Sequence, residues 1–271
     1  MAIELMTKEA LQENENLVYF RMFGPFQVEN KYGIVEEKPN LTSVPWMLLK
    51  YMLFNIYCSS GHLSDMLYDT KCVRVHMDDL IDVLWRASEK QSETSINRTR
   101  VRRLREALIP LHLDDVETGL VRFKYGDFSF NPKYTLLLDD CLFNAHIIKI
   151  AEWPMDDASV LQTCSEALEI YRGTYLLSSS ELAWLKPDQD HYQKLFEVLV
   201  RNTLERTKIT GDKRCLPLLC KRVVDLAPDW EEFHRDLVRY LAEQKEDKLL
   251  MQYIYSLSHS KETGPDWLIN I

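Results

Sequence analysis

The sequence lacks the features that mark membrane-spanning, exported and fibrous proteins. No apolar run approaches the roughly 18 to 20 residues that a membrane-spanning helix needs. Residues 1–16 are acidic and contain no basic and apolar leader, so we expect no signal peptide. With 8 glycines and 10 prolines in 271 residues, a linker-rich or fibrous chain is excluded. We therefore expect a cytoplasmic globular protein that does not contact a membrane.

Motifs of common catalytic and nucleotide-binding sites are also missing. The chain contains neither a Gly-x-Ser-x-Gly nucleophile motif nor a Gly-x4-Gly-Lys phosphate loop. Adjacent carboxylates such as Asp78-Asp79 and Asp139-Asp140 would point apart on a helix. Most of these pairs stand at expected helix starts, where they favour the helix dipole. We therefore expect no enzymatic activity and no cofactor.

The six cysteines show no Cys-x2-Cys pair, and in a cytoplasmic protein we expect them to be reduced. One pattern of cysteine and histidine nevertheless has the ligand types of a structural zinc site. It consists of two Cys-x3-His pairs, formed by Cys58, His62, Cys72 and His76. In the alternative interpretation, Cys58 is a core residue at a helix end and His76 begins the next helix. We favour this alternative and expect no bound metal.

The most unusual feature that is present is a cluster of arginines on an acidic chain. Residues 95–108 hold five arginines and one acidic residue, whereas the whole chain has a formal net charge of -9. On a helix that turns about 100° per residue, Val101, Leu104 and Leu108 share one face. Hydroxyl and guanidinium groups lie opposite this face or beside it, at Ser95, Arg98, Thr99, Arg102, Arg103 and Arg105. Such a helix is suited to read base edges in the major groove, and the alternative is an ordinary solvated basic face.

The segments around this helix predict a small α+β domain. Short runs of β-branched and aromatic residues predict strands, and apolar residues at helical spacing predict helices. Two short strands and a tight turn predict a β-hairpin at 121–130, with Arg122 and Lys124 near its tip. The order of elements is that of a winged helix-turn-helix domain, which we place at 17–132 behind a leader at 1–16. The expected elements are strands at 17–23, 26–29 and 34–36, helices at 43–56, 77–87 and 95–109, and a hairpin at 121–130.

From about residue 139 onward, the sequence shows helical periodicity only. Paired helices joined by short turns such as 210–212 predict a tetratricopeptide-like all-α domain over 133–271, with a plain helical bundle as the alternative. Aromatic residues such as Tyr171, Tyr192 and Tyr255 are expected in the seams between helices, or else along a concave groove. The expected helices are 140–152, 158–172, 188–209, 212–227, 230–244 and 246–258.

Six segments carry patterns of known regulators. In the first half they are a strand pair around a glycine at 20–28, a helix ending in Leu-Trp at 76–85, the arginine-rich helix at 101–108 and a wing position at 125–130. In the second half they are the two neighbouring segments 167–176 and 183–185. In this order and spacing they resemble the SARP family of bacterial transcriptional regulators. In that family an OmpR-type winged helix precedes a bacterial transcriptional activator domain. Two features depart from the family pattern, namely the long segment 57–75 and Asn97 on the packed helix face.

The resemblance implies an activator that binds double-stranded promoter DNA, commonly at direct repeats, and recruits RNA polymerase. A single winged helix buries little surface, so we also expect a homodimer or tandem binding. The alternative function is an adaptor that has lost DNA binding and uses the helical array for protein interaction. Within the DNA-binding hypothesis, Arg98 and Arg102 read bases, Ser95 and Thr99 bind bases or phosphates, and Arg103, Arg105, Arg122 and Lys124 neutralise phosphates.

Overall fold

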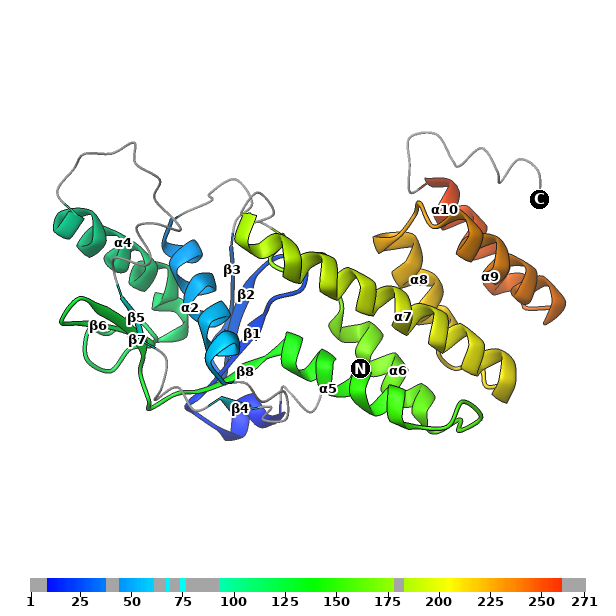
Figure 1. The fold of residues 1–271 in the computed structure, drawn as a ribbon, viewed down its shortest axis with the longest axis horizontal. Coiled ribbons are helices and arrows are strands. Elements are labelled where there is room, and N and C mark those ends of the chain that lie inside the picture. Colours follow the sequence, from blue (N-terminus) through cyan, green and yellow to red (C-terminus); the bar gives the residue numbers. More distant parts are fainter. Residues whose placement is uncertain are drawn as a thin grey trace. The chain divides into compact units, whose positions relative to one another are not determined.

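The computed structural model describes residues 9–37, 44–60, 67–68, 74–76, 93–177 and 183–259 (Figure 1). Contacts divide the chain into two compact units. The first, which we call the sheet unit, comprises Met1–Ala145 and Thr174–Gln189. The second, the helical unit, comprises His146–Gly173 and Asp190–Ile271. An N-terminal region with small mixed sheets and a helical C-terminal region are thus both present, as the sequence predicts at this coarse level.

A five-stranded sheet forms the centre of the sheet unit, with the strand order β3-β2-β1-β8-β4. The three expected strands are present, and β1 pairs antiparallel with β2. Strand β8 pairs parallel with β1 and begins after residue 132, so the domain boundary expected there falls inside the sheet unit. Its sequence, Thr-Leu-Leu-Leu, is a short apolar run that periodicity alone does not identify as a strand. The strands are β1 Leu17–Arg21, β2 Gln27–Asn30, β3 Gly33–Glu36, β4 Leu67–Tyr68 and β8 Thr135–Leu138.

Aromatic and aliphatic side chains fill the core of the sheet unit. The ring of Phe20 lies 6.4 Å from that of Phe26 and 6.3 Å from that of Phe130, measured between centroids. Helix α2 (Val44–Ser60) buries Leu49 and Met52, the face that helical spacing predicts. The expected leader is partly folded, because residues 9–13 are helical and Leu11 packs against the core.

A second sheet of three strands has the order β5-β7-β6. The predicted hairpin is present as β6 (Val121–Lys124) and β7 (Asp127–Phe130). Its two-residue turn has positive φ at both Tyr125 (55°) and Gly126 (88°), the conformation of a type I′ hairpin. Strand β5 (Arg74–His76) pairs with β7 at the end of the long segment 57–75. His76 therefore ends a strand and does not begin a helix, and the helix expected at 77–87 lies outside the described residues.

Helices α6, α8, α9 and α10, with the C-terminal parts of α5 and α7, form the helical unit. All six helices lie where apolar periodicity predicts them. Tyr171 and Tyr192 are buried, but Tyr255 is 66 % exposed, so its expected place in a seam is wrong. None of the helices in the described part of the chain has the length and apolarity that a membrane crossing requires. The helices are α5 Asp139–Glu152, α6 Val160–Ile170, α7 Lys186–Thr210, α8 Leu216–Leu226, α9 Glu231–Glu243 and α10 Asp247–His259.

Arg206 on α7 is the largest fully buried side chain of the helical unit. Its guanidinium donates hydrogen bonds to the carbonyl oxygens of Ile150 and Trp153, both at 2.8 Å, and to that of Pro154. These carbonyls lie at or just after the C-terminal end of α5, where backbone acceptors have no partner within the helix. The cation therefore satisfies the C-terminal end of α5 from a position near the C-terminal end of α7.

Candidate nucleic-acid interface

Helix α4 (Glu93–Leu108) contains the arginine cluster and packs as the sequence predicts. Val101, Leu104 and Leu108 are all buried, and Arg102 and Arg103 are exposed. Ser95, Arg98 and Thr99 lie on the same helix, but their side chains are outside the described part of the structure. The basic face of α4 is thus open to solvent at the two arginines whose side chains are described.

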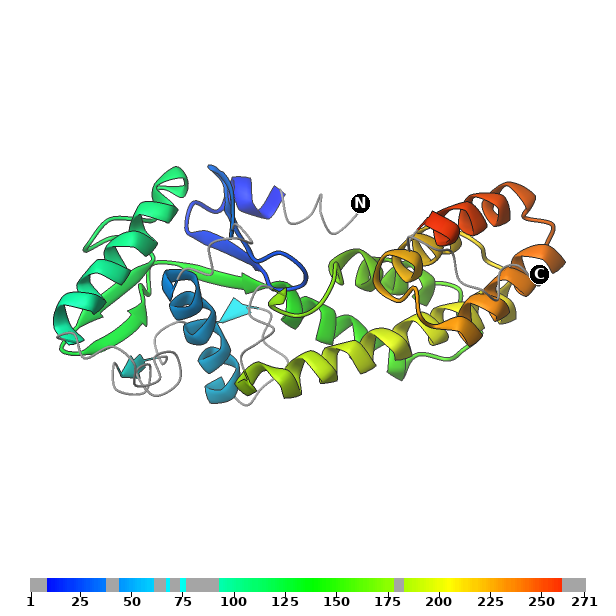
Figure 2. The same cartoon turned by 90° about the horizontal axis from the view of Figure 1, so that it is seen from above.

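Arg105 joins α4 to the hairpin. Its Nη2 donates a hydrogen bond to the carbonyl oxygen of Val121, at 3.3 Å, where β6 begins. Helix α4 and the hairpin lie side by side in both views of the fold (Figures 1 and 2). Burial lowers the pKa of the Arg105 guanidinium, and the nearby carboxylate of Asp115 opposes this shift. The side chain is half-buried, so Arg105 is less available to phosphate than we expected from the sequence.

The three-stranded sheet buries one face and presents the other to solvent. Val75 and Phe128 point into the core, and both are buried. The opposite face of this sheet, which we call the outer face, carries six polar side chains. Its members form two rows across the strands, Arg74–Ser129–Arg122 and His76–Asp127–Lys124.

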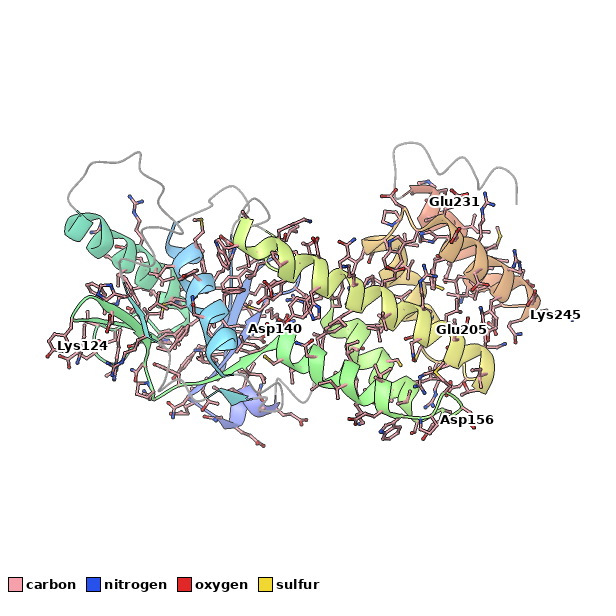
Figure 3. All side chains as sticks on the ribbon, in the orientation of Figure 1. Lys124, Asp140, Asp156, Glu205, Glu231 and Lys245 are labelled. Carbon is pink, nitrogen blue, oxygen red and sulfur yellow. The ribbon has the colours of Figure 1, made fainter. Side chains whose placement is uncertain are left out.

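A pocket of about 340 Å³ lies on the outer face. Arg122 donates its Nε hydrogen to the carbonyl oxygen of Glu117, at 3.2 Å, which fixes the guanidinium beside the strand. Lys124 is exposed at the end of the hairpin (Figure 3). The lining includes Arg74, Arg122, Lys124, Tyr125, Asp127 and Ser129.

Few carboxylates compensate the cations of α4 and the outer face. Arg102 lies 3.6 Å from Glu106, on the same helix. His76 lies 3.9 Å from Asp127, and this contact is an ion pair only when the imidazole is protonated. Among the described residues, no carboxylate lies within ion-pair distance of the half-buried Arg105 or of four further cations, Arg74, Arg103, Arg122 and Lys124. This surface therefore has cationic groups that are free to attract an anion.

Most residues of the candidate zinc site lie outside the part of the chain that the structure describes. His62, Cys72 and the side chain of Cys58 lie outside the described residues, and His76 is exposed on β5. The described part of the chain holds no group of three or more His, Cys, Asp or Glu side chains arranged for a metal. Cys215 and Cys220 are buried thiols, and burial raises the pKa of each to about 12.

Sequence reasoning missed Arg74, because the strand that carries it, β5, has only three residues. A signal was nevertheless present, since Val73-Arg74-Val75-His76 alternates apolar and polar residues. Only pairing with β7 shows that Arg74 belongs to the same surface as Arg122.

No known protein-family model matches the chain, and no curated protein is similar to it in sequence. Function must therefore be inferred from the residues of the interface.

Proposed function

We propose that the protein is a sequence-specific DNA-binding regulator of transcription, of the kind found in the SARP family. In this proposal, the sheet unit is a winged helix-turn-helix domain with α4 as its recognition helix and β6–β7 as its wing. The helical unit is a tetratricopeptide-like activator domain that contacts RNA polymerase. The protein acts in the cytoplasm on promoter DNA as a homodimer or in tandem, and it is not an enzyme.

One observation carries the proposal: an acidic chain keeps uncompensated cations on α4 and on the neighbouring hairpin. A cation without a carboxylate partner can replace the counterions of the DNA backbone, and release of those counterions drives association. Exposed arginines such as Arg102 also have the planar fork that pairs with guanine in the major groove.

The division of roles follows from position. On α4, Arg98 and Arg102 read base edges, Ser95 and Thr99 bind bases or phosphates, and Arg103 neutralises phosphate. On the hairpin, Arg122 and Lys124 contact the backbone. Arg105 holds α4 against β6 through Val121 and thereby fixes the angle between helix and wing.

The test is selection of bound fragments from genomic DNA by the purified full chain. We expect the wild type to enrich a short repeated motif and Arg98→Ala/Arg102→Ala to lose that enrichment, at a cost of about 1–3 kcal/mol per base-reading arginine. Arg239→Ala, which changes an exposed arginine of α9, is the matched control and should enrich the same motif. Equal enrichment by wild type and double variant would show that α4 does not read sequence. No enrichment by folded wild type would reject the proposal.

A second candidate is an adaptor that uses the helical unit to bind a protein. The observation in its favour is a pocket of about 600 Å³ between α8 and α10, beside the exposed side chains of Met251 and Tyr255. Heparin chromatography at low salt separates the two candidates, because an acidic adaptor flows through and a DNA-binding protein is retained.

A further inference from the structure

The outer face of the three-stranded sheet brings two arginines to either side of one hydroxyl group. On β7, Ser129 lies directly opposite Arg74 of β5 and directly opposite Arg122 of β6. Neighbouring strands are about 4.8 Å apart, and directly paired residues project from the same face. The Ser129 hydroxyl therefore stands midway between two strands that each carry a guanidinium group.

These three side chains line the pocket of about 340 Å³ on the outer face. A guanidinium presents donors in a rigid fork that matches the oxygens of a phosphate, and a serine hydroxyl adds a neutral donor. Arg122 uses its Nε for the carbonyl of Glu117 and keeps its terminal nitrogens for a ligand. Lys124 adds a third positive charge to the lining.

One carboxylate, that of Asp127, also lines the pocket. It lies in the second row, between His76 and Lys124, and one of its oxygens is 3.9 Å from Nε2 of His76. Asp127 weakens the attraction for an anion without occupying either arginine. The described lining therefore has three permanent positive charges against one negative charge.

We propose that this pocket binds a phosphate group, with Arg74 and Arg122 gripping its oxygens and Ser129 donating a hydrogen bond. The phosphate comes either from the DNA backbone or from a free phosphorylated small molecule. The DNA source rests on the proposed function and adds Arg74 to the interface; the free source does not depend on DNA binding.

The first arm of the test uses inorganic phosphate and the full chain. The Nε–Hε NMR signals of Arg74 and Arg122 are assigned by their absence from the spectra of Arg74→Lys and Arg122→Lys. We expect phosphate to shift both signals, and chloride at equal ionic strength to leave them in place. Asp127→Asn should raise the affinity for phosphate about 2- to 5-fold, the range for removing one exposed charge contact. Because this effect is a gain, misfolding does not explain it.

The second arm measures binding of duplex DNA between 50 and 200 mM salt. If Arg74 binds one backbone phosphate, wild type loses about 3.5-fold more affinity over this range than Arg74→Ala does, because each contact contributes about 0.9 to the salt slope. The loss should be equal for all sequences. Arg239→Ala, the control on α9, should behave as wild type.

The two arms separate the two proposals. If wild type binds DNA but Arg74→Ala keeps the full salt slope and phosphate shifts neither signal, the pocket is refuted and the regulator remains. If wild type binds no DNA but phosphate shifts both signals, the pocket takes a free phosphate and the regulator is refuted. If wild type neither binds DNA nor responds to phosphate, both are refuted.

Discussion

The cations on α4 and the outer face differ from several cations of the helical unit in how close their acidic neighbours lie. In the helical unit, five exposed or half-buried cations lie beside carboxylates: Arg201 beside Glu197, Lys208 beside Asp236, Lys213 beside Glu246, Arg214 beside Asp212 and Arg235 beside Glu231. On α4 and the outer face, only Arg102 and His76 have a carboxylate within 4 Å among the described residues. The number of cations therefore says less about function than the placement of the acids around them. A cation that its own fold has paired is already occupied, and one without a partner is available to a ligand.

The comparison is sharpest at the buried arginine of the helical unit. Arg206→Met should lower the free energy of unfolding by about 3–5 kcal/mol, because the carbonyls of Ile150 and Trp153 would remain buried without a donor. Arg201→Met, on the same helix but exposed and paired with Glu197, should cost about 0.5 kcal/mol or less. Urea unfolding of both variants measures the difference. Similar costs would mean that Arg206 does not hold the end of α5.

A matched pair of exposed arginines tests the comparison directly. The side chains of Arg102 and Arg214 are 70 % and 73 % exposed, and their nearest carboxylates lie at 3.6 and 2.5 Å. We expect Arg102→Ala to weaken binding to the preferred DNA site by about 1–3 kcal/mol. Arg214→Ala should leave DNA binding unchanged, because Arg214 donates hydrogen bonds to both carboxylate oxygens of Asp212, whereas Arg102 and Glu106 lie too far apart for a hydrogen bond. Fluorescence anisotropy with one labelled duplex measures both, and an equal loss would remove the distinction between the two surfaces.

Much of this fold follows from local sequence. Periodicity located β1, β2, the hairpin and the helical-unit helices, because each has enough residues to show a period of 2.0 or 3.6. It also located the packed face of α4, at Val101, Leu104 and Leu108. The partner strands β4 and β5 escaped detection because they have two and three residues, and β8 because its Thr-Leu-Leu-Leu run does not alternate; only pairing with a distant strand defines them.

The interface was only partly predictable, for a related reason. Arg102, Arg103, Arg122 and Lys124 belong to elements that local sequence indicates. The availability of a cation depends on contacts across the fold, which local sequence does not specify. Arg105 is half-buried because its guanidinium reaches Val121, sixteen residues away, and Arg74 joins the surface through β7.

A contact in the helical unit shows that proximity of an acid does not always make an ion pair. His146 Nε2 lies 3.9 Å from Glu166 and has no hydrogen-bond partner among the described residues. Burial lowers the pKa of His146 below its ordinary 6.5, against the opposing effect of Glu166, so the imidazole is neutral at pH 7.

This histidine therefore links stability to pH in a defined direction. Below about pH 6.5 His146 binds a proton more readily in the unfolded chain than in the folded one, so the free energy of unfolding falls as the pH is lowered. One such group contributes at most about 1.4 kcal/mol per pH unit. Urea unfolding measures the free energy of unfolding at a series of pH values. Between pH 7.5 and 5.5, we expect this free energy to depend less on pH in His146→Gln than in wild type. His191→Gln, which changes an exposed histidine of α7, should keep the pH dependence of wild type. A slope that steepens in His146→Gln would instead mean that His146 is charged and paired with Glu166. The contact would then belong with the paired cations of the helical unit.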